Sequence, residues 1–594
     1  LYKLSENKLY PRLGKFQYLI AATYILICLS VAIYFSSNYM ELVYYRAGNP
    51  TFLDYLFGTL IFLLVLEYSR REHKVLFGLA IFLIFYTLYG YIFPGILWHT
   101  GTSLERIITS ATIEIKLGIF GTYAQMGTGL IGAFLLLIGI AEGFGINRSL
   151  IKTIIFSLGK KPELIPQTTV VSSAAIGMCT GSGAAGCALL GQFSIPAMTR
   201  AGFPPIHAAS TLGAAMLGAL IMPPVMAIAA FLMVEFLGVT YFEVMIRGFV
   251  VAAVYFLSIG IAVYYLTLRY ISTKKVETRA EEATKVFGEL TKLDKTYSIV
   301  FISCIAILIY LMGGLWWPEV RAAVTSAFIL LLVASVLHLA MGGGSNAREK
   351  IVSLLRNIKA GIEAYPRILV DIMLLLAVLG IIIDLFTVTG WLLKLGMLLT
   401  SIGRESVILL ILVAFLFGYF LGFGMPPSAV YIITAVLAAP ALINFGFNPW
   451  VAHFFIFLVA TISEFTPPVA LISAITSRMA GTPFVKTALV QQVWILPLYL
   501  MIFAVLTRPE LVVKPGFEQL VAMVLVMIGC VTVTTGAFGK FSNRILIDAP
   551  IRVFSIAIGP LILFYPNVTL AYLLAPIGVL LTIIALRRTA KVAA

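Results

Sequence analysis

Charge is scarce in this chain. Only 11% of its 594 residues are charged and 61% are hydrophobic, which gives a mean hydropathy of +1.03. Soluble domains carry about 25% charged and about 45–50% apolar residues. The composition therefore excludes a soluble enzyme or binding domain and indicates an all-α protein that crosses the lipid bilayer many times. At about 20 residues per span, the apolar runs allow roughly 14 to 16 spanning or re-entrant segments.

Cysteines and catalytic motifs are also sparse. The five cysteines are scattered and form no CxxC pair, which argues against a disulfide framework and against a zinc site. The sequence contains no HExxH and no Walker A motif. Gly181-Ser182-Gly183 lacks the strand–turn–helix setting of a nucleophile elbow. We therefore expect neither an enzyme nor a transporter that hydrolyses ATP by itself.

Acidic residues are few, at 26 against 41 basic ones, and the net charge is +15. The basic residues lie in short loops between apolar runs, which is the positive-inside pattern of cytoplasmic loops rather than the basic face of a nucleic-acid-binding domain. The segment Glu67–Lys74 is predicted to be one such solvated turn. Because basic residues also precede the first span and close the chain, we expect both termini to be cytoplasmic and no nucleic-acid partner.

What the chain does contain is interrupted apolar runs. The first interruption is Met178-Cys179-Thr180-Gly181-Ser182-Gly183-Ala184-Ala185-Gly186, and Ile221-Met222-Pro223-Pro224-Val225 follows it. Open backbone at membrane depth is tolerated only where protein or a cavity covers it. The apolar arms around residues 180–183 are too short to cross a bilayer, so they predict a re-entrant hairpin, and the proline pair predicts a broken helix. Together they mark a candidate binding site.

The same arrangement occurs a second time. Pro196, Gly202-Phe203 and Pro223-Pro224-Val225 recur 244 positions later as Pro440, Gly446-Phe447 and Pro467-Pro468-Val469. The second hairpin tip is predicted at Gly422–Ser428 and the second break at Ser463–Pro468. Interrupted helices in corresponding halves point to the midplane site of a secondary transporter built from inverted repeats. Ordinary kinks in a membrane scaffold are the alternative.

The pattern divides the chain into six parts. They are a small membrane module (1–98), an amphipathic connector (99–117), a first transport repeat (118–270), a charged linker (271–296), a second transport repeat (297–510) and extra C-terminal spans (511–594). Within the second repeat we expect an amphipathic stretch at 348–359 and a separate span at 368–387.

At its motifs the sequence resembles the membrane component of tripartite ATP-independent periplasmic (TRAP) transporters. The resemblance is to the fused form, which joins the small and large membrane subunits and works with a TAXI-type binding protein. The motifs that carry it are Ser194-Ile195-Pro196, Ile221-Met222-Pro223-Pro224-Val225-Met226, Glu235-Phe236-Leu237-Gly238, Gly424-Met425-Pro426 and Ser463-Glu464-Phe465-Thr466-Pro467-Pro468-Val469-Ala470. Glu464 departs from the aspartate usual in the family.

The resemblance implies a sodium-driven importer of a small organic acid in the cell (inner) membrane. It also implies an elevator-type movement, delivery of substrate by an extracytoplasmic TAXI-type binding protein and a monomeric membrane unit. Two other readings remain open: a hairpin-repeat carboxylate or ion transporter that needs no binding protein, and an intramembrane enzyme or structural subunit.

Sodium is a hard cation that oxygen ligands suit best, and unwound backbone beside small hydroxyls supplies such oxygens. One sodium cage is predicted from Thr180, Ser182, Gly183, Gly218 and Met222, and a second from Gly424, Ser428, Ser463 and Thr466. The predicted substrate site consists of Thr180, Ser182, Pro223, Pro224, Gly424, Pro426, Ser428, Glu464, Pro467 and Pro468. Each hydroxyl could instead bond its own helix backbone.

Overall fold

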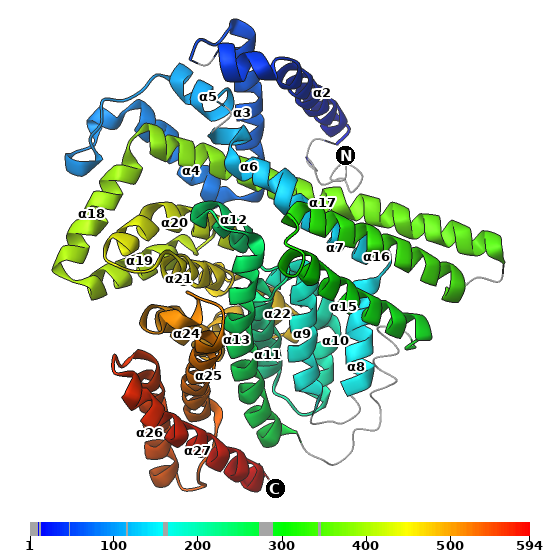
Figure 1. The fold of residues 1–594 in the computed structure, drawn as a ribbon, viewed down its shortest axis with the longest axis vertical. Helices are drawn as coiled ribbons and strands as arrows, with labels where there is room; N and C mark the ends of the chain where they lie inside the picture. Colours follow the sequence, from blue (N-terminus) through cyan, green and yellow to red (C-terminus); the bar gives the residue numbers. More distant parts are fainter. Residues whose placement is uncertain are drawn as a thin grey trace. The chain divides into compact units, whose positions relative to one another are not determined.

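The computed structural model describes residue 10 and residues 14–46, 48–114, 117–158, 164–271, 289–342 and 346–593. Every regular element in these ranges is a helix (Figure 1), which confirms the predicted all-α class. Most of the predicted charged linker, residues 272–288, lies outside the described residues.

The described helices suit a multi-pass membrane protein. Eleven of them are long and apolar enough to span a bilayer, or up to 12 if the bent pair Phe484–Trp494 and Leu496–Thr507 counts as one span. Shorter apolar helices accompany them, and most of these belong to the interrupted regions that the sequence singled out: Pro205–Ile221, Ile228–Leu237, Val407–Leu421 and Pro449–Phe465.

The chain forms two compact units, of residues 1–135 with 363–401, and of residues 136–362 with 402–594. In the first unit lie α2 (Phe16–Ser37), η2 (Glu41–Tyr45), α3 (Phe52–Glu72), α4 (Lys74–Leu88), η3 (Gly90–Ile92), η4 (Gly95–Leu97), α5 (Leu104–Thr112), η5 (Gly118–Phe120), α6 (Thr122–Met126) and η6 (Gly127–Ile131). Three helices pass from one unit into the other, α7 (Gly132–Gly143), α17 (Ala347–Val388) and α18 (Trp391–Glu405).

Two segments are more helical than the sequence suggested. The predicted turn Glu67–Lys74 is reduced to His73, because α3 continues to Glu72 and α4 begins at Lys74. Glu67 pairs with Arg70 one turn later, at 2.7 Å, and both are good helix formers. The amphipathic stretch 348–359 and the span 368–387 form one helix, α17, which continues through Pro366.

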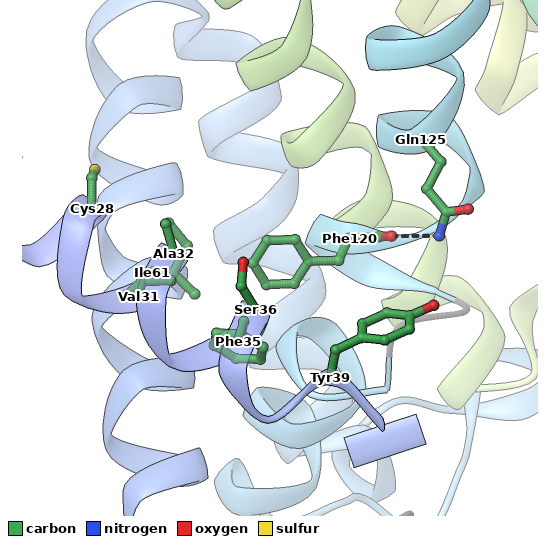
Figure 2. Close-up of a pocket in the computed structure, with 9 residues that line it drawn as sticks. All are labelled: Cys28, Val31, Ala32, Phe35, Ser36, Tyr39, Ile61, Phe120 and Gln125. Atoms are coloured by element: carbon green, nitrogen blue, oxygen red, sulfur yellow. Dashed lines mark hydrogen bonds between the residues drawn. The ribbon is translucent and has the colours of Figure 1, made fainter. Parts of the chain in front are cut away.

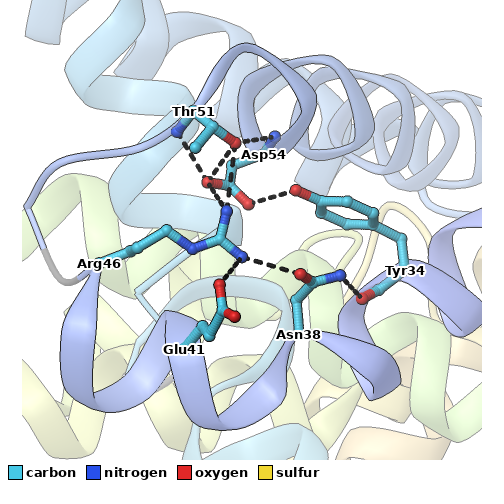
Figure 3. Close-up of polar contacts among 6 residues, drawn as sticks. All are labelled: Tyr34, Asn38, Glu41, Arg46, Thr51 and Asp54. Carbon is cyan, nitrogen blue, oxygen red and sulfur yellow. Dashed lines mark hydrogen bonds and ion pairs between the residues drawn. The ribbon is translucent and has the colours of Figure 1, made fainter.

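A buried ion pair holds the first unit together where α3 begins (Figure 3). The Asp54 carboxylate is fully buried and lies 3.2 Å from a guanidinium nitrogen of Arg46. It also accepts hydrogen bonds from the Tyr34 hydroxyl at 2.7 Å and from the Thr51 backbone N–H at 2.7 Å. Thr51 and Asp54 form a capping box, so one carboxylate both starts α3 and ties it to α2.

We predict that Asp54→Ala lowers the melting temperature of the purified protein clearly. It leaves the Arg46 charge and the Tyr34 hydroxyl short of a buried partner, which costs about 2–3 kcal/mol. Glu41 is the matched control, because its side chain contacts the same guanidinium at 3.1 Å but is 63% exposed. Glu41→Ala should cost less than about 1 kcal/mol. Equal losses in the two variants would contradict the role given to Asp54.

The second unit holds most of the two predicted repeats, whereas residues 118–135 of the first and 363–401 of the second belong to the first unit. Its helices from the first repeat are α8 (Ile146–Leu158), α9 (Ile165–Thr180), α10 (Gly183–Arg200), α11 (Pro205–Gly218), η8 (Ala219–Ile221), α12 (Ile228–Leu237) and α13 (Tyr241–Tyr270). From the second repeat come α15 (Lys292–Gly313), α16 (Glu319–Met341), α19 (Val407–Leu421), α20 (Pro427–Asn444), α21 (Pro449–Thr461), η9 (Ile462–Phe465), α22 (Leu471–Ala480), α23 (Phe484–Trp494) and α24 (Leu496–Thr507).

The backbone repeats at the offset that the sequence showed. Pro196 lies inside α10 and Pro440 inside α20. The glycines that follow these helices, Gly202 and Gly446, have φ of 105° and 91°. Each hairpin is followed by a helix whose first residue is proline, α11 and α21. The repeat is therefore a property of the fold and not only of the sequence.

Three further helices follow the second repeat: α25 (Phe517–Phe538), α26 (Ile545–Phe564) and α27 (Val568–Ala593), after the short turn η10 (Pro509–Leu511). Helix α25 packs against α13 and α24. Arg247 of α13 donates to the carbonyls of Val512 and Val513, at 2.7 and 2.9 Å. The C-terminal helices are thus fixed to both repeats.

Candidate functional site at two helix breaks

The first hairpin turns at Gly181 and Ser182. Helix α9 ends at Thr180, and Gly181 adopts the left-handed conformation with φ of 56°. The Ser182 hydroxyl caps α10 by accepting from the Ala185 N–H at 3.3 Å. The Thr180 hydroxyl donates to the Ile176 carbonyl at 3.1 Å. Both hydroxyls of the first predicted cage therefore have a local backbone partner.

The first helix break lies against this tip. After η8 the chain is extended at Met222, and the Met226 N–H donates to the Met222 carbonyl at 3.1 Å. A methyl group added at Gly181 would overlap the Met226 carbonyl oxygen. The hairpin tip and the break of the first repeat are therefore in direct contact, and only glycine fits at position 181.

The second break repeats this backbone. The Ala470 N–H donates to the Thr466 carbonyl at 3.0 Å, which is the bond from Met226 to Met222 shifted by 244 positions. Met226 and Ala470 also share a positive φ, of 52° and 36°. The Thr466 hydroxyl donates to the Ile462 carbonyl at 2.9 Å, so it too bonds its own helix.

The second hairpin tip also meets its break. Helix α19 ends at Leu421 and α20 begins at Pro427, so residues 422–426 form the predicted turn. A methyl group at Gly422 would lie 3.1 Å from Cβ of Ser463. The Ser463 hydroxyl is buried and has no hydrogen-bond partner among the described residues.

The remaining predicted residues are divided between buried and open positions. Ser428 lies buried in the first turn of α20, one residue after its first proline, and Gly424 and Pro426 are half-buried in the tip. Pro223 and Pro224 are buried, whereas Pro467 is half-buried and Pro468 is exposed. Gly218 faces α13, where a methyl group would lie 2.8 Å from Cε1 of Tyr255. The structure therefore places Gly218 in a helix contact.

The breaks let each broken helix cross into the other repeat. Helix α22 of the second repeat packs against α10 and α11 of the first, and α12 of the first packs against α20 and α21 of the second (Figure 1). Phe236 of α12 lies 5.9 Å, between ring centroids, from Tyr431 and 5.5 Å from His453. The two repeats are interlocked at their breaks.

Glu464 is a charged group that lies at this crossing. A methyl group at Gly183 would lie 2.7 Å from the Glu464 Oε2 atom and 2.5 Å from Ile472. The carboxylate also faces the Ala184 backbone N–H, at the start of α10. Oε2 is buried without a hydrogen-bond partner in the described part of the chain. Glu464 of the second repeat thus reaches the hairpin tip of the first repeat. The tip is also the N-terminus of α10, where the helix dipole stabilises a negative charge.

A comparison of the sequence with models of known protein families identifies the family of this chain. A family model described as "Tripartite ATP-independent periplasmic transporter, DctM component" matches residues 60–511. The chain belongs to this DctM family. A search of curated proteins found no match.

The residues matched by the DctM family model include the whole candidate site. The match covers both hairpins and both breaks and ends at Leu511, before α25. It begins within α3, inside the module predicted at 1–98. The family is one of transporters and not of enzymes, and it works with an extracytoplasmic substrate-binding protein, so the chain is a membrane transport protein.

Sequence reasoning missed the side chains that brace the breaks. Tyr241 of α13 donates its hydroxyl to the carbonyls of Pro224 and Val225, at 2.6 and 3.1 Å. Gln492 of α23 donates to the Phe465 carbonyl at 2.9 Å. Neither residue belongs to a repeated motif, because the 244-residue offset carries Tyr241 to Val485 and Gln492 back to Gly248. Only three-dimensional contact identifies them.

The first unit contains a cavity (Figure 2). It has a volume of about 580 Å³ and apolar walls that include Val31, Phe35, Ile61 and Phe120. Gln125 lies at its edge and donates to the Phe120 carbonyl at 3.0 Å. None of the predicted site residues lines this cavity.

We predict that Gly181→Ala stops transport, whereas Gly238→Ala leaves most of it. Both glycines have a positive φ, of 56° and 63°, so each alanine costs about 1–2 kcal/mol of backbone strain. Only at Gly181 does the new methyl also meet the break, since nothing lies within 4 Å of the site at Gly238.

Uptake and melting temperature should be measured together for both variants. The overlap at Gly181 should lower the melting temperature further than Gly238→Ala does, and uptake at a temperature where both variants are folded should be reduced at least about tenfold only in Gly181→Ala. Equal uptake in both variants would mean that contact between tip and break does not matter for transport.

Proposed function

We propose that this DctM-family chain is a sodium-coupled importer of a small organic acid and that a TAXI-type binding protein delivers the substrate. In this proposal the chain is a fused, monomeric unit of the cell (inner) membrane with both termini in the cytoplasm. The module at 1–98 stands for the small subunit, and the repeats move as an elevator.

One observation carries the proposal: each hairpin tip touches a helix break within the same unit. Gly181 lies against Met226 and Gly422 against Ser463. Each break exposes backbone between two short helices, which is where secondary transporters coordinate a cation and an anionic substrate. The oxygen-rich surroundings, with hydroxyls, carbonyls and the Glu464 carboxylate, suit a hard cation.

The family description supports transport that is driven by a gradient and not by ATP hydrolysis. An ATP-independent transporter draws on an ion gradient or on the substrate gradient itself. The sodium choice rests on the oxygen ligands at the breaks, and the elevator on two interlocked repeats that can move together. The organic acid suits a helix N-terminus such as that of α10, because backbone N–H groups and the helix dipole favour anions there.

We predict that uptake into proteoliposomes requires an inward sodium gradient. Purified full-length chain, a TAXI-type binding protein and a panel of radiolabelled carboxylates should give uptake with sodium outside. Potassium in place of sodium should give background uptake, because the potassium ion is larger than the sodium ion and does not fit the same set of oxygen ligands. Equal uptake under an inward proton gradient without sodium would contradict sodium coupling.

We also predict that uptake requires the binding protein. Free carboxylate at the same concentration, without the partner but with the full sodium gradient, should give near-background uptake, because a tripartite cycle needs the docked partner to hand over substrate. A binding protein of a different TRAP class serves as the control. Strong uptake by the membrane chain alone would favour a hairpin-repeat transporter that needs no binding protein.

A further inference from the structure

Helices α25, α26 and α27 form a C-terminal bundle beyond the residues that the DctM family model matches, which end at Leu511. Both α25 and α27 pack against α13 of the first repeat. At this contact the Tyr265 hydroxyl of α13 lies 3.1 Å from the Thr535 hydroxyl of α25 and donates to the Thr582 carbonyl of α27 at 3.2 Å. All three residues are buried. One side chain of α13 therefore ties two helices of the bundle to the first repeat.

Arg247 of α13 attaches the segment that leads into the bundle. Only 6% of this residue is exposed, and its guanidinium donates to the carbonyls of Val512 and Val513 at 2.7 and 2.9 Å. The guanidinium carbon also lies 3.7 Å from the ring centroid of Trp450, at the start of α21 in the second repeat. A buried cation needs such partners. Arg247 therefore joins the C-terminal segment to helices of both repeats.

Two more arginines fasten the bundle at helix ends. Arg508, directly after α24, is buried and donates to the carbonyls of Ile562 and Tyr565, at the end of α26, at 3.1 and 2.8 Å. Arg269, near the end of α13, donates at 3.0 Å to the carbonyl of Phe538, the last residue of α25. Carbonyls at the end of a helix lack partners within that helix. Each arginine therefore caps one helix of the bundle from one of the repeats.

The helices that hold the bundle also brace the two breaks. Tyr241 of α13 donates its hydroxyl to two carbonyls of the first break. Helix α24 acts on the second break through Gln492. The Tyr499 hydroxyl of α24 donates to Gln492 Oε1 at 2.7 Å, and Gln492 Nε2 donates to the Phe465 carbonyl. The bundle is therefore attached to the same helices that position the candidate site.

We propose that the C-terminal bundle belongs to the moving part of the transporter and travels with the two repeats in every transport cycle. This inference rests on the proposed elevator movement and specifies which helices take part in it. Sliding of the bundle along α13 would break its buried contacts with Tyr265 and Arg247, and no water is available inside a membrane to replace them. The bundle therefore moves as one body with α13 and α24 and is not a stationary support.

Distances between pairs of spin labels test this inference directly. In a chain without native cysteines, reconstituted in nanodiscs, the labels are attached to four exposed positions through Leu573→Cys in α27, Leu257→Cys in α13, Leu489→Cys in α23 and Leu63→Cys in α3. The pair of positions 489 and 63 reports movement of the second repeat relative to the small membrane module. Pairs of position 573 with 257 and with 63 report movement of the bundle relative to the first repeat and to that module.

Pulsed electron paramagnetic resonance should be recorded with sodium and with potassium as the only cation. An elevator that takes up two positions should give two distances between positions 489 and 63 across these conditions. The bundle should then give two distances to position 63 and a single distance to position 257. Two distances to position 257 with a single distance to position 63 would overturn the inference, because the bundle would then stay with the small module. A single distance in all three pairs would instead contradict the elevator movement itself.

A covalent link tests whether transport needs the bundle to move along α13. Arg269→Cys in α13 and Lys540→Cys, two residues after the Phe538 carbonyl that Arg269 contacts, supply two thiols for a bifunctional maleimide. Uptake of radiolabelled carboxylates into proteoliposomes should stay within about twofold of that of the same double variant without the cross-linker. A larger fall in the cross-linked sample would overturn the inference, because the bundle and α13 would then have to move apart during transport.

Discussion

The structure depends on one constraint: backbone that leaves the helix inside a membrane needs partners for its polar groups. At both breaks the chain supplies some of them internally, through the bonds from Met226 to Met222 and from Ala470 to Thr466. The rest come from elsewhere in the fold. A tyrosine on α13 serves the first break and a glutamine on α23 the second. Each break is therefore stable only because helices from the rest of the second unit surround it.

This need explains why the repeats interlock. When a helix breaks, its second half is free to leave the direction of the first, and here α12 and α22 each pack on helices of the other repeat. Glycines in α10 let the second repeat approach this helix closely. A methyl group at Gly183 would lie 2.7 Å from Glu464 Oε2, and one at Gly191 would lie 2.7 Å from the Met479 sulfur. A transport site shared by two interlocked halves can change shape only if both halves respond.

The sequence predicted what depends on local chemistry. Proline pairs, glycine turns and the 244-residue offset were sufficient to place both hairpins and both breaks, because these residue types dictate backbone conformation directly. The sequence left open whether the hydroxyls of Thr180 and Thr466 bond their own helices, as they do, and it did not reveal that Tyr241 braces the first break. Those facts depend on which helices meet, as does the continuous α17, where an amphipathic half and an apolar half were expected separately.

The interlocking of the repeats is the central claim, and cross-linking tests it most directly. In a chain without native cysteines, Gly191→Cys in α10 and Met479→Cys in α22 should react together with a short thiol cross-linker, because Gly191 and Met479 are in contact across the repeats. Ala435→Cys in α20 occupies the position equivalent to Gly191 in the second repeat itself. Efficient linkage of 479 to 191 and little to 435 is the predicted result. Linkage of 479 to 435 in place of 191 would contradict the account.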